Sequence, residues 1–149
     1  MGISKAADYA ILAVGYLATS AKSSGVDIRS KSELVESLSL PREFLSQILQ
    51  KLVRANILSS TRGARGGYSL RRPASETTFL DVIEAIDGRS KMVECLAEDY
   101  DDCGRLPVCH SIVSKMAYLQ GEIESLLASV TFQDISVSEA LNPAGVPRE

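Results

Sequence analysis

The sequence predicts a mainly α-helical fold with a small β wing. Three patterns predict it: apolar residues at helical spacing up to about residue 55, a glycine-rich turn between two short runs of β-forming residues, and a heptad repeat beyond Pro107. The chain has 149 residues, of which 45% are hydrophobic, and this suffices for one domain with a buried core. We expect a winged helix-turn-helix domain at residues 1–88 and a cysteine-containing loop at residues 89–106. A long helix followed by a C-terminal helix should occupy residues 107–141, and a flexible tail residues 142–149.

Three helices are predicted in the first third of the chain. The first spans residue 3 to about 20, where apolar residues recur at helical spacing, and a loop follows from Ser20 to Val26. Ser30 and Glu33 form a capping box that starts a second helix, Lys31 to Leu38. Pro41 opens a third helix that runs to about Asn56. Its apolar stripe comprises Phe44, Leu45, Ile48, Leu49, Leu52 and Val53, and its polar face comprises Arg42, Ser46, Gln47, Gln50, Lys51 and Arg54.

A β-hairpin follows the third helix. Residues 57–61 and 68–70 have β-forming composition, and a glycine-rich turn that carries Arg62 and Arg65 separates them. Two short helices with a tight turn, followed by a hairpin, are typical of a winged helix-turn-helix domain, whose second helix enters the major groove of DNA. Arginine suits both phosphate and a narrow minor groove, so we expect Arg62 and Arg65 to contact the backbone or the minor groove.

The charge distribution also favours DNA binding. Residues 1–72 hold eleven Lys and Arg against five Asp and Glu, whereas residues 73–149 hold five against fourteen. A basic half can lie on phosphates and release counterions, and an acidic half discourages non-specific adhesion. On the third helix we expect base contacts from Ser46, Gln47 and Gln50, and phosphate contacts from Arg42, Lys51 and Arg54.

Two further helices are predicted beyond the hairpin. Thr78, with Asp81 three residues later, starts a fourth helix that ends near Asp87 and Gly88. From Pro107 a long helix carries apolar residues spaced 4, 3, 4, 3 and 4 apart, at Ile112, Met116, Leu119, Ile123, Leu126 and Val130. A stripe of this length on so small a domain predicts a homodimer, which suits a protein that binds two DNA half-sites.

The three cysteines of the chain, Cys95, Cys103 and Cys109, fall within fifteen residues between the fourth and the long helix. This clustering predicts a metal or redox site. The first residues show neither a signal peptide nor a membrane span, so we expect a cytoplasmic protein with no membrane partner. Cysteines in an odd number, without an export signal, argue against a disulfide framework and for reduced thiols.

Several motifs in order make the chain resemble the IscR/NsrR-type transcription regulators of the Rrf family. They are I-S-K-A-A-D-Y-A (Ile3 to Ala10), R-G-A-R-G-G-Y-S-L (Arg62 to Leu70), D-V-I-E-A-I-D-G (Asp81 to Gly88) and the three cysteines. The resemblance covers roughly residues 2–141, and it is greatest to the branches that control iron-sulfur cluster assembly or sense nitric oxide. It implies a crossed-over dimer of winged-helix repressors or activators, and an iron-sulfur cluster (4Fe-4S or 2Fe-2S) held by Cys95, Cys103 and Cys109.

Three cysteines leave a fourth ligand to be identified. Asp8 from the partner subunit is the ligand that the resemblance favours, and His110 and the acids of the loop are alternatives. Adjacent helical residues point about 100° apart, so His110 and Cys109 do not readily converge on one iron. The seven residues between Cys95 and Cys103 exceed the spacing of the best-known members, and Ile112 stands where some members have a histidine ligand.

We therefore expect a homodimeric transcription regulator, and not an enzyme, whose binding to a double-stranded DNA operator follows the state of its cluster. Its signal would be iron-sulfur status, oxygen or nitric oxide. Alternatives are a thiol- or zinc-based winged-helix regulator without a cluster, a DNA-binding protein with structural or vestigial cysteines, and a small iron-sulfur redox protein. Against the last stand the lone histidine and some 70 residues of winged-helix pattern.

Overall fold

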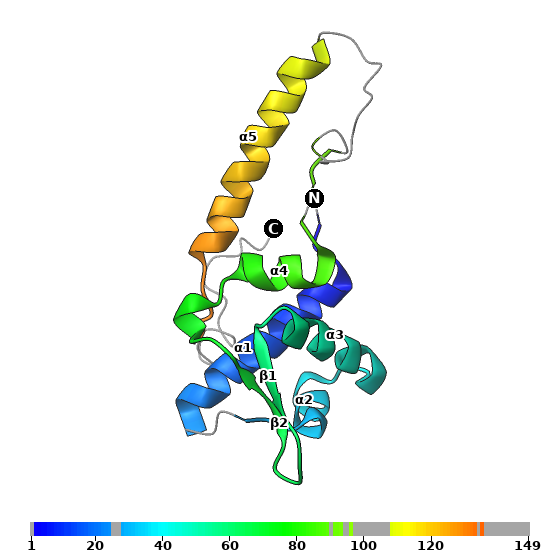
Figure 1. Cartoon of the computed structure of the whole chain (residues 1–149), viewed down its shortest axis with the longest axis vertical. Coiled ribbons are helices and arrows are strands. Elements are labelled where there is room, and N and C mark those ends of the chain that lie inside the picture. The colour runs from blue at the N-terminus through cyan, green and yellow to red at the C-terminus, as the bar shows by residue number, and fades with distance from the viewer. Residues whose placement is uncertain are drawn as a thin grey trace, which may run out of the picture.

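The computed structural model describes residues 2–24, 28–89, 91–93, 96, 108–133 and 135. Within these residues it has five α-helices, a short 3-10 helix and one two-stranded antiparallel sheet, which confirms the predicted mainly α fold with a β wing. Figure 1 shows α1, α2, α3, α4 and the hairpin gathered at one end of the molecule, with α5 extending away from them. Among the described helices, none is long and apolar enough to cross a membrane.

Helix α1, Lys5–Ser24, is the central element of the core. Ser4 caps it, because its Oγ accepts a hydrogen bond from the backbone N–H of Ala7 at 3.1 Å. Its inward face is rich in alanine, which lets the neighbouring helices approach closely. The loop expected from Ser20 onward was wrong as far as Ser24, because Ser20 is itself buried and the helix continues past it.

Helices α2, Lys31–Leu38, and α3, Arg42–Arg54, confirm the predicted helix pair. The capping box of α2 is formed: the Ser30 backbone N–H donates to the Glu33 carboxylate at 2.7 Å, and the Glu33 N–H donates to Ser30 Oγ at 3.2 Å. Ser39, with φ of 52°, ends α2 in the left-handed region. Pro41 is the N-cap of α3, one position before the first helical residue where we had placed it.

The wing consists of strands β1, Leu58–Thr61, and β2, Gly67–Leu70, within one residue of the predicted limits. A short segment before α2 extends this sheet, because Arg29 N–H donates to the Tyr68 carbonyl at 2.9 Å and Tyr68 N–H donates to the Arg29 carbonyl at 2.8 Å. A Cβ on Gly67 would lie 2.2 Å from the Arg29 carbonyl oxygen. Only glycine therefore allows the chain before α2 to dock on the wing.

Helix α4, Phe79–Asp87, follows a short 3-10 helix, η1, Ala74–Glu76. A capping box starts it as expected, since the Thr78 N–H donates to the Asp81 carboxylate at 3.0 Å and the Asp81 N–H donates to Thr78 Oγ1 at 3.1 Å. Ser4 holds the other end of α4 against α1, because its N–H donates to Asp87 Oδ2 at 2.9 Å. The N-terminus of α1 and the C-terminus of α4 thus meet.

Helix α5, Val108–Ser129, is the predicted long helix. The chain that leaves it returns to the core, where Phe132 is fully buried and stacks on Phe79 with ring centroids 4.6 Å apart. Two backbone hydrogen bonds support this return, from Phe79 to Val130 at 3.0 Å and from Phe132 to Thr77 at 3.1 Å. Phe132 was not among the expected core residues. The C-terminal helix and tail that we expected beyond residue 135 lie outside the described residues.

Candidate nucleic-acid interface and cysteine segment

The outward face of α3 carries Gln47, Gln50 and Arg54, as the sequence predicts. These residues lie one or two turns apart and are all exposed. Glu43 shares their face and is also exposed, and the sequence analysis had passed over it. A carboxylate here repels phosphate and can accept a hydrogen bond from the N4 amino group of cytosine. Because Glu43 lies four residues before Gln47, helical spacing would have placed it on this face.

Arg42 and Ser46 lie at the edge of this face that adjoins α2. Arg42 is exposed, and its Nη1 donates to Ser32 Oγ on α2 at 3.4 Å. The Ser46 hydroxyl donates to the Arg42 backbone carbonyl, one turn earlier, at 2.8 Å. Ser46 therefore has only oxygen lone pairs left for a base, so it can accept a hydrogen bond there without breaking its own.

Lys51 points toward α4. Its Nζ donates a hydrogen bond to the Ile86 backbone carbonyl at 3.2 Å. This carbonyl lies in the last turn of α4, where carbonyl groups have no partner within the helix. One N–H of the ammonium group thus has a partner within the fold, and the salt dependence of DNA binding decides whether the others contact phosphate, as expected from the sequence.

The tip of the wing presents Arg62 and Arg65, both exposed. Within the described residues neither arginine forms an ion pair. The turn between them is tight: Gly63 has φ of 113°, and a Cβ on Gly66 would lie 2.2 Å from the Thr61 carbonyl oxygen. The two guanidinium groups are therefore carried on a closely folded turn and are available to an anion.

Helix α3 and the wing form one surface. A hollow of about 180 Å³ between them is lined by Gln50, Val53 and Arg54 of α3 and by Ser60 and Tyr68 of the hairpin. Figure 1 shows α3 on one side of the hairpin, with α2 next to it. This arrangement brings together the predicted groove-binding helix and the predicted wing.

The cysteine segment is described only in part. Cys109 lies in the first turn of α5 and is half-buried, whereas Cys95 and Cys103 lie outside the described residues. His110 follows in the same turn, and its side chain is also outside them. Asp8 lies in the first turn of α1 and is exposed. The described residues contain no group of three His, Cys, Asp or Glu that could hold a metal ion.

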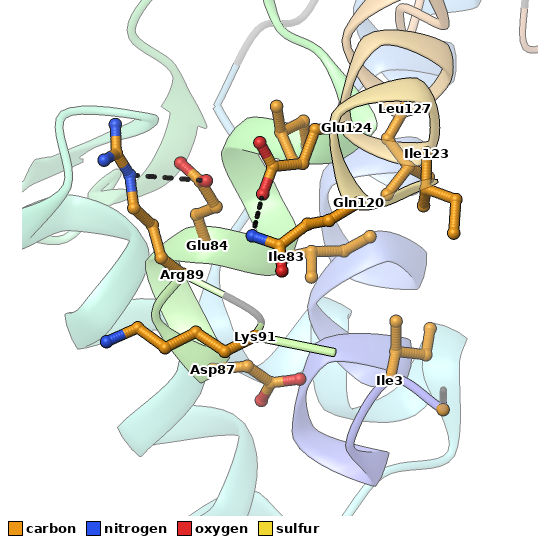
Figure 2. A pocket seen from close by; sticks show the side chains of 12 residues that line it. Ile3, Ile83, Glu84, Asp87, Arg89, Lys91, Gln120, Ile123, Glu124 and Leu127 are labelled. Carbon is orange, nitrogen blue, oxygen red and sulfur yellow. Dashed lines mark hydrogen bonds and ion pairs between the residues drawn. The ribbon is translucent and has the colours of Figure 1, made fainter. Parts of the chain in front are cut away.

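Gln120 ties the chain that leads to the cysteines to α5. Its Oε1 accepts from the backbone N–H of Met92 at 3.1 Å, and its Nε2 donates to Glu124 Oε1 at 2.9 Å. Figure 2 shows Gln120 and Glu124 beside a pocket of about 290 Å³ between α4, α5 and the N-terminal Ile3. Gln120 could not be predicted from the sequence, because nothing in its spacing distinguishes it from a solvated helix residue.

The heptad stripe of α5 is largely uncovered. Among its residues Ile112, Leu119, Leu126 and Val130 are 57%, 46%, 66% and 44% exposed, and Met116 and Ile123 are half-buried. Val130 lies just beyond the end of the helix. Monomeric proteins rarely expose apolar side chains in a continuous stripe of this kind.

The sequence matches the Rrf2 family, described as iron-dependent transcriptional regulators, over residues 3–138. It is similar to a Mycobacterium tuberculosis (strain H37Rv) protein described as an HTH-type transcriptional regulator, with 31% identity over 139 residues, 91% of this chain and 81% of the relative. It is also 33% identical over 87 residues to the HTH-type transcriptional regulator IscR of Cereibacter sphaeroides, covering 58% of this chain and 56% of that protein.

Solved structures show the same fold. The B. subtilis CymR structure superposes with a TM-score of 0.70 and 25% identity, over 90% of this chain and 95% of that one. The T. potens IscR structure gives a TM-score of 0.65 and 24% identity, over 100% and 94% of the two chains. With the helix pair, the wing and the long helix, these matches establish that the chain is a transcription regulator rather than an enzyme, and that it belongs to the Rrf2 family.

Proposed function

We propose that the protein is a homodimeric regulator whose binding to a double-stranded DNA operator is controlled by an iron-sulfur cluster, with Cys95, Cys103 and Cys109 as ligands. The observation that supports this proposal most strongly is that α5 combines two features. Its first turn holds Cys109, and its length carries the exposed apolar stripe. A single rigid helix therefore links the ligand segment to the surface through which two copies would associate.

The dimer follows from the hydrophobic effect. Leu119 and Leu126 expose about half or more of their side chains, and burying apolar area stabilises association by about 25 cal/mol per Å². A two-fold dimer would also place two α3 helices for two half-sites, which is how helix-turn-helix proteins read operators. In each subunit Gln47, Gln50 and Arg54 would face the major groove, and Arg62 and Arg65 would flank it.

The donor set fits a cluster. Thiolates are the usual ligands of iron-sulfur clusters, and Cys109 lies at the positive end of the α5 dipole. Asp8 is exposed in the first turn of α1 and is available as an oxygen ligand to the partner subunit. When bound, such a cluster would supply iron that exchanges ligands with oxygen or nitric oxide and that reflects iron-sulfur supply.

Two contacts suggest how the cysteine segment would act on DNA binding. Gln120 holds Met92, at the start of that segment, against α5, and Lys51 holds the last turn of α4 against α3. Residues 90–108 join α4 to α5, so a change in their arrangement would shift α5 relative to α4 and, in the dimer, alter the separation of the two α3 helices.

Thiol-based regulation is the second candidate. The CymR structure from B. subtilis is named as that of a global cysteine regulator, and a solved Staphylococcus aureus CymR, 27% identical to this chain, is described as an oxidised form. Two of the three cysteines would suffice for such a switch, and no iron would be needed.

The test begins with protein purified without oxygen. Visible absorbance, with iron, sulfide and zinc analysis, would identify the bound group, and affinity for a DNA selected from genomic fragments would be measured with and without the reconstituted cluster. We expect a coloured protein whose affinity changes at least tenfold on cluster loss, and Cys103→Ala to abolish that change while Ser111→Ala, on the same helix as Cys109, preserves it. A colourless protein whose affinity responds to disulfide formation would instead establish the thiol candidate.

A further inference from the structure

A second hollow lies behind the wing, and nothing proposed so far uses it. Its volume is about 460 Å³, and it lies between the C-terminal half of α1 and the chain that runs from β2 to η1. The floor is apolar, because Leu17 and Ala18 are 1% and 2% exposed and Leu70 is half-buried. The hollow is therefore a fixed part of the core surface.

Among the described residues that line this hollow, the charged ones are all cationic. Lys22, Arg71 and Arg72 line it together with the Ser69 hydroxyl, and no carboxylate is among the described lining residues. Within the described residues Lys22 and Arg71 form no ion pair, and both are exposed. Two uncompensated positive charges thus stand at the rim of one concavity, where their potentials add.

Arg72 forms an ion pair with Asp81, which offsets much of its charge. Its Nη2 lies 3.2 Å from Asp81 Oδ2, but the same carboxylate oxygen also accepts the capping hydrogen bond from the Thr78 N–H. The Nε of Arg72 is buried and has no acceptor within the described residues. A buried guanidinium N–H without a partner is rare. Since protein atoms cover this Nε, it does not itself contact a ligand, and the positive charge at the rim is that of Lys22 and Arg71.

The hollow is separate from the surface formed by α3. Side chains alternate along β2, so Tyr68 lines the hollow on the α3 side and Ser69 lines the hollow on the α1 side. Figure 1 shows the end of α1 and η1 on the other side of the hairpin from α3.

We infer that this hollow is an anion site that takes a phosphate group. A phosphate oxygen accepts hydrogen bonds from a lysine, an arginine and a hydroxyl at once, and arginine binds phosphate through paired N–H groups. The phosphate could belong to DNA that continues past the wing, or to a free phosphorylated small molecule that binds behind the hairpin. Neither source involves the cysteines, so the site is independent of the proposed cluster.

The test uses the double variant Lys22→Gln/Arg71→Gln and a matched control that loses the same charge elsewhere, Arg89→Gln/Lys115→Gln. In the first arm, binding to a 40-bp duplex of random sequence is measured by fluorescence anisotropy over a range of KCl concentrations. Each lost phosphate contact lowers the slope of log affinity against log salt by about 0.9. If DNA supplies the phosphate, the slope falls by about 0.9 in the double variant, because one phosphate contact is lost, and is unchanged in the control.

In the second arm, pyrophosphate is titrated into each protein by calorimetry at constant ionic strength. If a small molecule supplies the phosphate, pyrophosphate binds to the wild type and to the control but at least tenfold more weakly to the double variant, and the salt slopes agree. Equal slopes together with equal or absent pyrophosphate binding in all three proteins would overturn the inference. Arg71→Lys keeps the charge and should retain whichever binding Arg71→Gln loses, so that a folding defect is distinguished from loss of the site.

Discussion

The Nζ atom of Lys51 and the backbone carbonyl oxygen of Ile86 lie 3.2 Å apart in a hydrogen bond. The lysine belongs to α3 and the carbonyl to the last turn of α4, so the proposed DNA-binding helix is joined to the helix that leads into the cysteine segment. A lysine near a helix C-terminus also interacts favourably with the helix dipole.

Lys51→Met should therefore act on stability and leave phosphate binding unchanged. We expect the free energy of unfolding to fall by about 1 kcal/mol, the worth of one such hydrogen bond. The salt dependence of duplex binding should stay that of the wild type. A salt slope that falls by about 0.9 in Lys51→Met would show instead that Lys51 contacts a phosphate.

Arg65→Ala, at the tip of the wing, should weaken duplex binding markedly and leave the dimer intact.

Gly67→Ala should detach the segment before α2 from the wing. The added Cβ would lie 2.2 Å from the Arg29 carbonyl oxygen, a backbone atom that cannot move independently. We expect a loss of about 2–4 kcal/mol in unfolding free energy, measured by urea denaturation. Gly121→Ala is the control: no atom outside the helix backbone lies within 4 Å of its Cβ, and alanine in a helix should add about 0.5–1 kcal/mol. Equal stability of the two variants would contradict the docking of Arg29.

Phe132→Ala should cost about 3–5 kcal/mol of stability, because the ring is fully buried and stacks on Phe79. Thermal unfolding would measure the loss. Gln133→Ala, one residue later and exposed, should change stability by less than about 0.5 kcal/mol. If Phe132→Ala unfolds like the wild type, the chain beyond α5 does not contribute to the core.

The dimer prediction concerns the stripe of α5. Leu119→Lys/Leu126→Lys should convert the dimer to a monomer, because two charges would be buried without partners at its centre. Tyr118→Lys is the matched control, since Tyr118 is 64% exposed on α5 but lies off the stripe. Sedimentation equilibrium distinguishes the two states. A monomeric wild type, or a dimeric double variant, would remove α5 as the interface.

Stability should depend on pH through Glu33. The hydrogen bond from the Ser30 backbone N–H, followed by the one with the Ser30 hydroxyl and the charge of Arg29, lowers the pKa of Glu33. A group whose pKa is lower in the folded state stabilises above its unfolded pKa and loses this contribution as pH falls through the folded value. The side chain is 49% exposed, so the contribution is under about 1 kcal/mol.

The wild type should therefore exceed Glu33→Gln in stability at pH 7, and the difference should shrink between about pH 5 and pH 3. Denaturation at pH 7 and at pH 3 would measure the difference in the free energy of unfolding. Glu36→Gln, on the exposed side of the same helix, serves as the comparison. A difference that grows on acidification would have the wrong sign for this account.

The features that the sequence predicts correctly are the local ones. Both capping boxes, Ser30 with Glu33 and Thr78 with Asp81, depend on residues three positions apart, so the helix starts could be located from the sequence. Helical spacing also identifies the buried stripe of α3. Helical spacing predicts which face of α3 carries Lys51, however, and not its hydrogen bond to Ile86, which lies 35 residues later.

Features that depend on distant segments escaped prediction. Phe132 stands alone after a helix, and only the structure shows that Phe79 receives it. Gln120 is one polar residue among several on α5 until Met92 is placed against it. The ligand role of Cys95, Cys103, Cys109 and Asp8 stays a prediction.

The burial of Phe132 gives α5 the properties of a lever. One end is anchored in the core through this ring, and the other end, with Cys109, stands about 33 Å away at 1.5 Å per residue. A tilt of about 5° at the anchored end displaces the far end by about 3 Å, a distance on the scale of one bond between a metal and its ligand. In the proposed dimer, chemistry at the cysteine end would therefore change the angle between the two subunits, and the core that folds each subunit would stay as it is.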